Sequence, residues 1–154
     1  MITQRQILYV LLPVLLIACS TTPEEEQEPE LPPMDEMLAR LTEDQRNTCI
    51  NFRDIEVHKM VAEDVVSISM RRGGHYLAST ARSCRFLGNS NGTLVSDSWG
   101  MLCKGSGAVV DYDSDRFCPI RNIYEFESRE EAMKTLKVAQ ARREAEALIP
   151  NKEP

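Results

Sequence analysis

The sequence predicts an α+β domain, in which a small antiparallel sheet of about four strands carries helices on one face. Two disulfides are expected to stabilise this domain. One reason is that helical and strand patterns follow the order α-β-α-β-β-β-β-α, with glycine-containing turns between the later strands. The other is an even set of four domain cysteines: Cys49, Cys84, Cys103 and Cys118. The domain has about 115 residues, enough for one modest core and too few for two domains.

Residues 1–18 have the composition of an export signal. Arg5 is the only charged side chain before the apolar run from Ile7 to Ala18, and this run is shorter than the ~20 residues that a membrane-spanning helix needs. The run ends in Leu16-Ile17-Ala18-Cys19-Ser20, which resembles the lipobox of bacterial lipoproteins. The resemblance implies that the chain is cut before Cys19 and that this residue carries acyl chains, palmitate among them.

The same resemblance implies a location. Two or more acyl chains hold a protein stably on a bilayer, whereas a single chain binds only marginally. Ser20 replaces the aspartate that retains such lipoproteins in the inner membrane. We therefore expect an anchor in the lipid bilayer of the outer membrane, with the polypeptide facing the periplasm.

Residues 19–36 are expected to form an extended tether ahead of the domain at residues 37–149. From Thr21 to Glu36 the chain has seven carboxylates, four of its eight prolines and no Lys or Arg, so it cannot bury apolar surface. Without these acids and Arg5, 17 acidic and 17 basic side chains remain. The net charge of −6 thus comes from the tether, and the neutral domain gives no reason to expect nucleic acid as a partner.

Helical spacing appears twice in the first half of the domain. A short amphipathic helix is expected from near Asp35, because two prolines precede apolar side chains at helical intervals: Met34, Met37, Leu38 and Leu41. A second helix is expected to end at Gly73-Gly74, because four side chains before it share a helical face: Val61, Val65, Ile68 and Arg72.

Five stretches have the composition of strands bounded by turn residues. They are Cys49–Val57, His75–Arg85, Thr93–Cys103, Ala108–Tyr112 and Ile120–Phe126. The segments 88–92 and 104–107 would turn the chain into hairpins. Trp99 is the only tryptophan, and its place within a predicted strand favours a position in the core.

The C-terminal helix has a clear start signal. Ser128-Arg129-Glu130-Glu131 is a capping box, and the helix is expected to end near Leu148 because a proline follows at position 150. Its second half, Gln140–Ala147, offers only alanines as apolar side chains. Alanine burial yields little, so this half is expected to project beyond the core.

The four domain cysteines are expected to form two disulfides, as is usual for an even number of thiols in an exported protein. Their intervals of 35, 19 and 15 residues are too long for the close pairs of a metal site. If a hairpin turns at Ser90-Asn91, Cys84 and Cys103 lie ~20 Å apart and cannot bond. Two pairings remain: Cys49–Cys103 with Cys84–Cys118, or Cys49–Cys84 with Cys103–Cys118.

Residues 49–118 resemble a known family. A cysteine, a predicted helix ending in Met70-Arg71-Arg72-Gly73-Gly74-His75-Tyr76-Leu77, and a strand that reaches a second cysteine 35 residues after the first are similar to the disulfide domain of the outer-membrane lipoproteins that sense envelope damage for the Rcs phosphorelay. The resemblance implies the alternating pairing, Cys49 with Cys103 and Cys84 with Cys118. It also implies a sensor or accessory role in the cell envelope.

Few residues indicate chemistry. The segment Asp111–Asp115 imitates the first positions of a calcium loop, but Arg116 stands where such a loop needs glycine and Asn122 where it needs glutamate. Four arginines bracket the junction at His75 and would suit an anionic head group or a partner's carboxylates: Arg71, Arg72, Arg82 and Arg85.

These observations predict a non-catalytic, lipid-anchored envelope protein whose domain binds another periplasmic or outer-membrane protein. With four thiols paired and only two histidines, the chain offers little for nucleophilic catalysis, and no cofactor or bound metal is expected. The alternative is a cation-binding or enzymatic domain that uses the Asp111–Asp115 loop.

Overall fold

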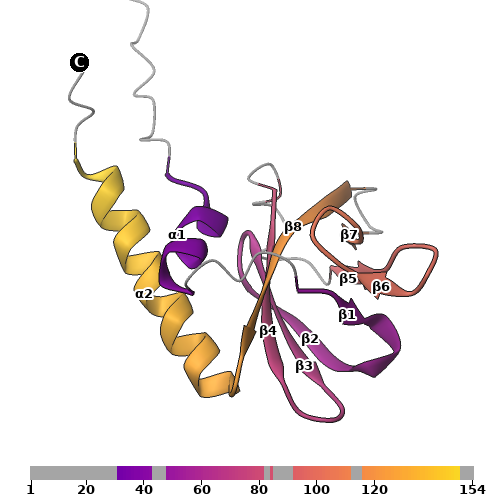
Figure 1. Cartoon of the computed structure of the whole chain (residues 1–154). Coiled ribbons are helices and arrows are strands. Elements are labelled where there is room, and N and C mark those ends of the chain that lie inside the picture. The colour runs from indigo at the N-terminus through magenta and orange to yellow at the C-terminus, as the bar shows by residue number, and fades with distance from the viewer. Residues whose placement is uncertain (1–30, 43–47, 82–83, 85–91, 112–115, 150–154) are drawn as a thin grey trace, which may run out of the picture.

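A computed structural model of the chain describes residues 31–42, 48–81, 84, 92–111 and 116–149 (Figure 1). Within these ranges the domain is a mixed α/β structure with two disulfides, as the sequence predicts, but with two helices instead of the expected three. The expected export signal, residues 1–18, and residues 19–30 of the expected tether lie outside them. No helix in the described part of the chain combines the length and the hydropathy needed to cross a bilayer.

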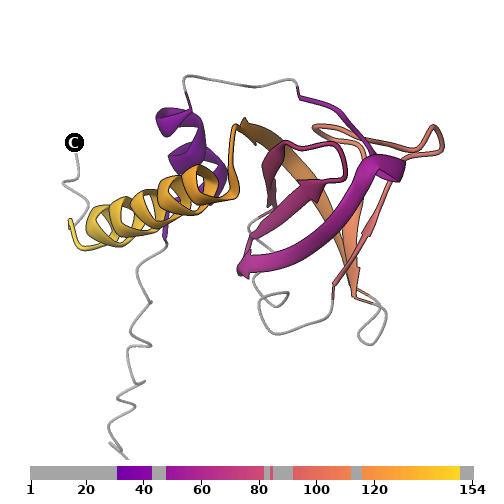
Figure 2. The same ribbon diagram turned by 90° about the horizontal axis from the view of Figure 1, so that it is seen from below.

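The main sheet has six antiparallel strands instead of the expected four, in the order β2-β3-β4-β8-β7-β5. Their bounds are Ile55–Ala62 for β2, Val65–Met70 for β3, His75–Thr80 for β4, Thr93–Val95 for β5, Ala108–Asp111 for β7 and Arg116–Phe126 for β8. The sheet curls toward a barrel, and both helices lie outside the curl (Figure 2). The larger strand number arises mainly because the segment predicted as the second helix is extended.

A two-stranded ribbon joins the two edges of this sheet. β1 (Ile50–Asn51) pairs with β6 (Met101–Leu102), and Phe52 N–H donates to the Gly100 carbonyl at 2.9 Å. β1 leads through a short 3₁₀ helix, η2 (Phe52–Asp54), into the edge strand β2, whereas β6 follows the other edge strand, β5. The ribbon therefore brings the two edges of the curled sheet together.

Two apolar clusters occupy the two sides of the sheet. The concave cluster lies within the curl and takes residues from strands alone, together with one disulfide: Ile50, Val66, Ile68, Ala78, Cys84, Leu94, Leu102, Val109, Cys118, Ile120 and Ile123. The convex cluster lies between the sheet and the helices: Met34, Met37, Leu38, Val65, Leu77, Tyr124, Phe126, Ala132, Leu136 and Ala139. Because side chains alternate along a strand, neighbours such as Val65 and Val66 belong to different clusters.

The two helices begin where the sequence signals predict. α1 (Met34–Leu41) follows Pro33, so the last three residues of the expected tether belong to the domain. α2 (Arg129–Ala147) starts at Ser128, whose Oγ accepts a hydrogen bond from Glu131 N–H at 3.2 Å. The Tyr124 hydroxyl donates to the Asp35 carbonyl at 2.7 Å and so ties α1 to β8.

The prediction of a helix before Gly73-Gly74 is wrong. The segment contains the end of β2, a two-residue connection at Glu63-Asp64, and β3. Apolar residues at positions 61, 65 and 68 suit a helical face. However, Val65, Val66 and Ile68 are β-branched, which favours a strand, and they lie on both faces of a strand that is buried on both sides. The two glycines, with φ of 88° and 92°, form the turn from β3 to β4 instead of a helix end.

The turn that was expected at Ser90-Asn91 lies outside the described residues, but the strands that it was expected to join, β4 and β5, do not pair with each other. β4 lies between β3 and β8, and β5 pairs with β7, so the distance argument against a Cys84–Cys103 bond loses its premise. The structure has the alternating pairing. Cys49–Cys103 continues the β1–β6 ribbon with a Cα–Cα distance of 4.3 Å, and Cys84–Cys118 joins the segment after β4 to β8 with a distance of 5.7 Å.

Candidate functional site

Two of the four candidate arginines lie in the described part of the chain. Arg71 and Arg72 are exposed on the turn between β3 and β4, and Arg71 N–H donates to the Asp54 carbonyl at 2.9 Å. Arg82 and Arg85 lie outside the described residues. His75, which the sequence places beside these arginines, is buried, with 3% of its surface exposed. The expected basic cluster is thus represented by two exposed side chains on one turn.

His75 forms a buried cluster with two serines on the convex side of the sheet. Its Nε2 lies 3.0 Å from Ser67 Oγ and its Nδ1 lies 3.0 Å from Ser69 Oγ. Burial lowers the pKa of His75, and the nearby Arg129 lowers it further. A neutral imidazole has one donor and one acceptor nitrogen, so one serine donates to the ring and the other accepts from it.

The distance between Ser67 and His75 is that of a nucleophile and its general base. However, both side chains are buried, and the third position holds the Ser69 hydroxyl where a triad has a carboxylate. A serine that substrate cannot reach does not act as a nucleophile. The cluster instead satisfies the polar groups of three residues beneath the helix layer.

The turn between β5 and β6 presents Trp99 to solvent, with 87% of its surface exposed. The Asp97 carboxylate fixes this turn, because its Oδ1 accepts from Trp99 N–H and from Met101 N–H, each at 2.9 Å. Ser106 Oγ donates to the other carboxylate oxygen at 3.4 Å. The large aromatic side chain of Trp99 therefore extends from a turn whose backbone is fixed by hydrogen bonds to Asp97.

The prediction of a core position for Trp99 is wrong. It assumed one strand over 93–103, whereas the segment contains a turn with Gly100 at a φ of 73°. The sequence does carry a signal for this turn, since Asp at the first position and Gly at the fourth are typical of a type I turn. Phe117 and Val57 are also exposed, but they lie on strands and at smaller exposed fractions.

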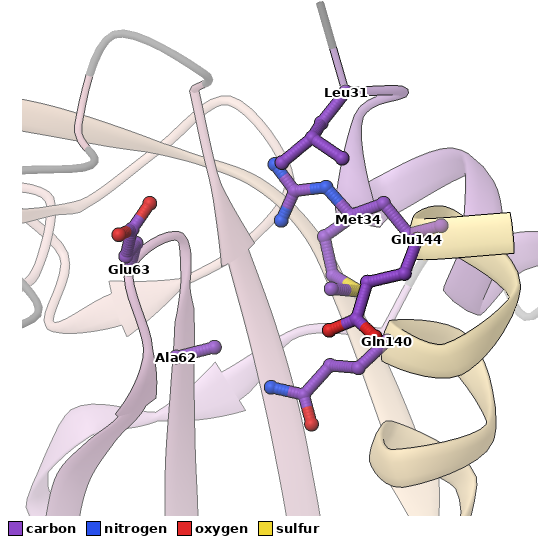
Figure 3. A pocket seen from close by; sticks show the side chains of 7 residues that line it. Leu31, Met34, Ala62, Glu63, Gln140 and Glu144 are labelled. Atoms are coloured by element: carbon purple, nitrogen blue, oxygen red, sulfur yellow. The ribbon is translucent and has the colours of Figure 1, made fainter. Parts of the chain in front are cut away.

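A pocket of about 290 Å³ lies where the β2–β3 connection meets α1 and the second half of α2 (Figure 3). Its lining residues are Leu31, Met34, Ala62, Glu63, Gln140, Arg143 and Glu144. Figure 3 shows Ala62 and Glu63 on one side and Gln140 and Glu144 extending from α2 on the other. None of these residues was singled out from the sequence as part of a site.

A buried ion pair stands beside the pocket. Arg143 is 7% exposed, and its Nη1 lies 3.3 Å from Oδ2 and 3.5 Å from Oδ1 of Asp64, which is 2% exposed. A second ion pair joins Arg40 of α1 to Glu146 at 2.9 Å. As expected, the second half of α2 contributes no residue to either apolar cluster, but these two ion pairs attach it to α1 and to the β2–β3 connection. The contacts of this half of the helix are made by long charged side chains, which the prediction did not consider because it was based on the alanines alone.

Of the loop that the cation-binding alternative uses, Asp111–Asp115, the structure describes only Asp111. Asp111 ends β7 and is the strand partner of Arg116, whereas residues 112–115 lie outside the described ranges. Among the residues that the structure describes, no three His, Cys, Asp or Glu side chains gather as metal ligands.

Comparison with curated proteins and with solved structures found no match to the chain. A comparison with protein-family models did find one, which covers residues 2–146 and thus the N-terminal segment as well as the domain. It is described as a family of unknown function, DUF6491. Because the match spans nearly the whole sequence, the chain belongs to the DUF6491 family.

Proposed function

We propose that this protein is a lipoprotein of the bacterial outer membrane whose periplasmic domain binds another envelope protein through the turn that carries Trp99. The N-terminal part of the proposal rests on the sequence Leu16-Ile17-Ala18-Cys19-Ser20. The observation that carries the binding role is the exposure of Trp99 on a turn that Asp97 fixes.

An exposed tryptophan on a rigid backbone suits protein binding for two reasons. Tryptophan is among the residues enriched at the energetic centres of protein interfaces, because its large surface is removed from water on contact. A backbone that is already ordered loses little conformational entropy on binding. The two hydrogen bonds from the turn to Asp97 Oδ1 provide that order.

The position of the turn also suits a partner that approaches from the side away from the anchor. The loop before β6 and the start of α1 lie at opposite sides of the domain in both views (Figures 1 and 2). The acidic, proline-rich segment between Cys19 and α1 would hold the domain ~50 Å or less from the bilayer at ~3.1 Å per residue. Trp99 would then be presented to the periplasm.

Site-specific photo-cross-linking in cells tests the binding role. A photoreactive amino acid at position 99 of the full-length chain should give a discrete cross-linked product with one envelope protein. The same amino acid in place of Lys134, which is exposed on α2, is the control and should not give that product. A purified partner should bind the Trp99→Ala variant at least about tenfold more weakly, given that interface hot spots contribute ~2 kcal/mol or more.

The anchor is tested separately. Cys19→Ala removes the thiol that would be acylated, and the expected result is loss of acylation and of membrane attachment. Fractionation and mass spectrometry of the N-terminal peptide measure both. An unlipidated mature chain that still sediments with the outer membrane would contradict the lipoprotein proposal without affecting the role of Trp99.

A further inference from the structure

We infer that the Cys49–Cys103 disulfide is a site of thiol–disulfide exchange that a protein dithiol reduces, and that its reduction lets β1 separate from β6. The other disulfide, Cys84–Cys118, stays intact under the same conditions. The inference goes beyond the proposed function and requires neither the lipid anchor nor a partner at Trp99. It rests on three features: the different accessibility of the two disulfides, the small size of the ribbon that one of them closes, and the separate support of the two strands of this ribbon.

The first feature is the accessibility of the disulfides. Cys49 is exposed and Cys103 is half-buried, so the disulfide between them, called the ribbon disulfide below, lies at the surface of the domain. Cys84 and Cys118, with exposed fractions of 1% and 0%, lie inside the concave cluster. In thiol–disulfide exchange a thiolate must reach one of the two sulfurs, and exposed disulfides are the labile ones in folded proteins. A reductant therefore reaches the ribbon disulfide while the domain is folded, whereas it reaches the other disulfide only in an opened state.

The exchange proceeds in two steps that both occur at sulfur. A thiolate of the reductant attacks Cys49 Sγ, because Cys49 is the exposed member of the pair, and the bond to Cys103 breaks. Cys103 leaves as a thiolate and takes up a proton. The second thiolate of the reductant then attacks the sulfur of its own first cysteine, and Cys49 leaves as a thiolate that takes up a proton. Two electrons have then passed from the dithiol, which becomes a disulfide, to the ribbon disulfide, which becomes two thiols.

The second feature is the small size of the ribbon. β1 and β6 have two residues each and pair through Ile50 with Leu102 and Asn51 with Met101. In the described part of the chain, β6 is the only strand that pairs with β1. An isolated two-stranded ribbon is only marginally stable in water. The disulfide supports this one by linking residues 54 positions apart, which lowers the entropic cost of bringing the two strands together. Without the link, the ribbon should open more often.

The third feature is that the rest of the domain holds β6 independently of β1. Met101 N–H donates to Asp97 Oδ1 at 2.9 Å, and Cys103 N–H donates to the Ser106 carbonyl at 3.1 Å. Ser106 Oγ also donates to the Asp97 carboxylate, at 3.4 Å. These hydrogen bonds lie between β5 and β7 and do not involve β1. Reduction should therefore leave β6 and the turn that carries Trp99 in place.

β1 depends more on the ribbon itself. Phe52 N–H, just after β1, donates to the Gly100 carbonyl at 2.9 Å, and this bond also crosses to the β6 side. Beyond the ribbon the chain is fixed again at Asp54, whose carbonyl accepts from Arg71 N–H at 2.9 Å. Ile50 packs in the concave cluster and is 3% exposed. Opening is therefore expected between Cys49 and Asp54, where it breaks the Phe52 bond and uncovers Ile50.

Thiol mapping of the full-length chain without denaturant tests the exchange. Free thiols are first blocked with N-ethylmaleimide, and reduced thioredoxin is then added as the protein dithiol. Alkylation and peptide mapping should find two new thiols, at Cys49 and Cys103. Reduction of Cys84–Cys118 should be ~100-fold slower or more, because folded domains populate open states at ~10⁻³ or less. A thioredoxin whose second active-site cysteine is replaced by serine should be trapped as a mixed disulfide with Cys49.

Amide hydrogen exchange, followed by NMR before and after this selective reduction, tests the opening. The Phe52 amide should exchange about tenfold faster or more, because its partner lies across the ribbon. The amides of Met101 and Cys103 should keep their protection, because their acceptors are Asp97 and the Ser106 carbonyl. The fluorescence of the single tryptophan should not change, which distinguishes local opening from unfolding of the domain.

Two matched double variants separate the two disulfides. Cys49→Ser/Cys103→Ser should show the fast exchange of the Phe52 amide without any reductant, and thioredoxin should not increase it further. Cys84→Ser/Cys118→Ser also removes one disulfide but should keep the slow exchange at Phe52 until thioredoxin is added.

Three results would overturn the inference. They are equal rates of reduction for the two disulfides, earlier reduction of Cys84–Cys118, and a Phe52 amide that exchanges at the same rate with and without the ribbon disulfide. Thiol mapping and amide exchange of the unchanged chain give all three results, so the question is decided even if a variant fails to fold.

Discussion

The two sides of the sheet are packed in different ways. The concave cluster is aliphatic and contains the Cys84–Cys118 disulfide. The convex side is also apolar over most of its area, but it includes buried polar and charged groups: Asp64, Ser67, His75, Ser79 and Arg143. Burial of apolar surface hardly depends on pH, whereas a buried charge or imidazole makes stability depend on its protonation and its partner. The packing of the helices on the sheet should therefore depend on pH more strongly than the packing of the concave cluster does.

Breaking the buried ion pair should have the largest effect. Arg143→Met removes the cation that contacts the buried Asp64 carboxylate and should lower the free energy of unfolding by about 3–5 kcal/mol. Denaturant unfolding measures the loss. The double variant Asp64→Asn/Arg143→Met removes both charges and should recover most of it. Equal losses in the single and double variants would show that the charges themselves do not matter and that the contrast between the two sides is false.

Removing the concave disulfide should have a smaller effect. The Cys84→Ala/Cys118→Ala variant opens a link between residues 34 positions apart and should lower the free energy of unfolding by about 2–4 kcal/mol. Because no ionisable group is involved, the loss should be the same at pH 5 and at pH 8. A loss that changes between these two pH values would mean that the concave side is coupled to the titrating groups across the sheet.

The pH dependence due to His75 should be the smallest effect. Its pKa is lowered in the folded state from an ordinary value of 6.5, so between the two values the unfolded chain binds more protons. This contribution to stability is complete above pH 6.5 and is lost as the pH falls through the folded-state pKa. Unfolding followed from pH 8 to pH 4 should show the decline. His75→Gln should remove this part of it, whereas His58→Gln, which keeps His75, should not.

The same contrast explains how much of the fold could be predicted from the sequence. The start of α2 was predictable because Ser128 and Glu131 act within one turn of helix, and the number of disulfides followed from the cysteine count. The strand β3 was missed because it is buried on both faces and lacks the alternation that marks a half-buried strand. Its valines and isoleucine favoured a strand, but their spacing also suited a helix.

The candidate sites were harder to predict than the elements. Arg143 and Asp64 are 79 positions apart, and only the packing of α2 against the β2–β3 connection brings them together. Nothing in the neighbourhood of either residue signals a pair. Trp99 differs, because Asp97 and Gly100 mark its turn within four residues. Local turn chemistry was therefore available to prediction, whereas a site formed by distant elements was not.

The ribbon of β1 and β6 has a consequence for how other chains can associate with this domain. Exposed backbone at the edge of a sheet recruits further strands, both from binding partners and in aggregation. Here the ribbon spans the gap between β2 and β5, β5 has only three residues, and the exposed middle of β2 carries Glu56 and Lys59. Charged side chains and short strands both discourage strand addition. The domain is thus protected against edge-to-edge polymerisation, so any association with another chain would have to use side chains instead of exposed strand edges.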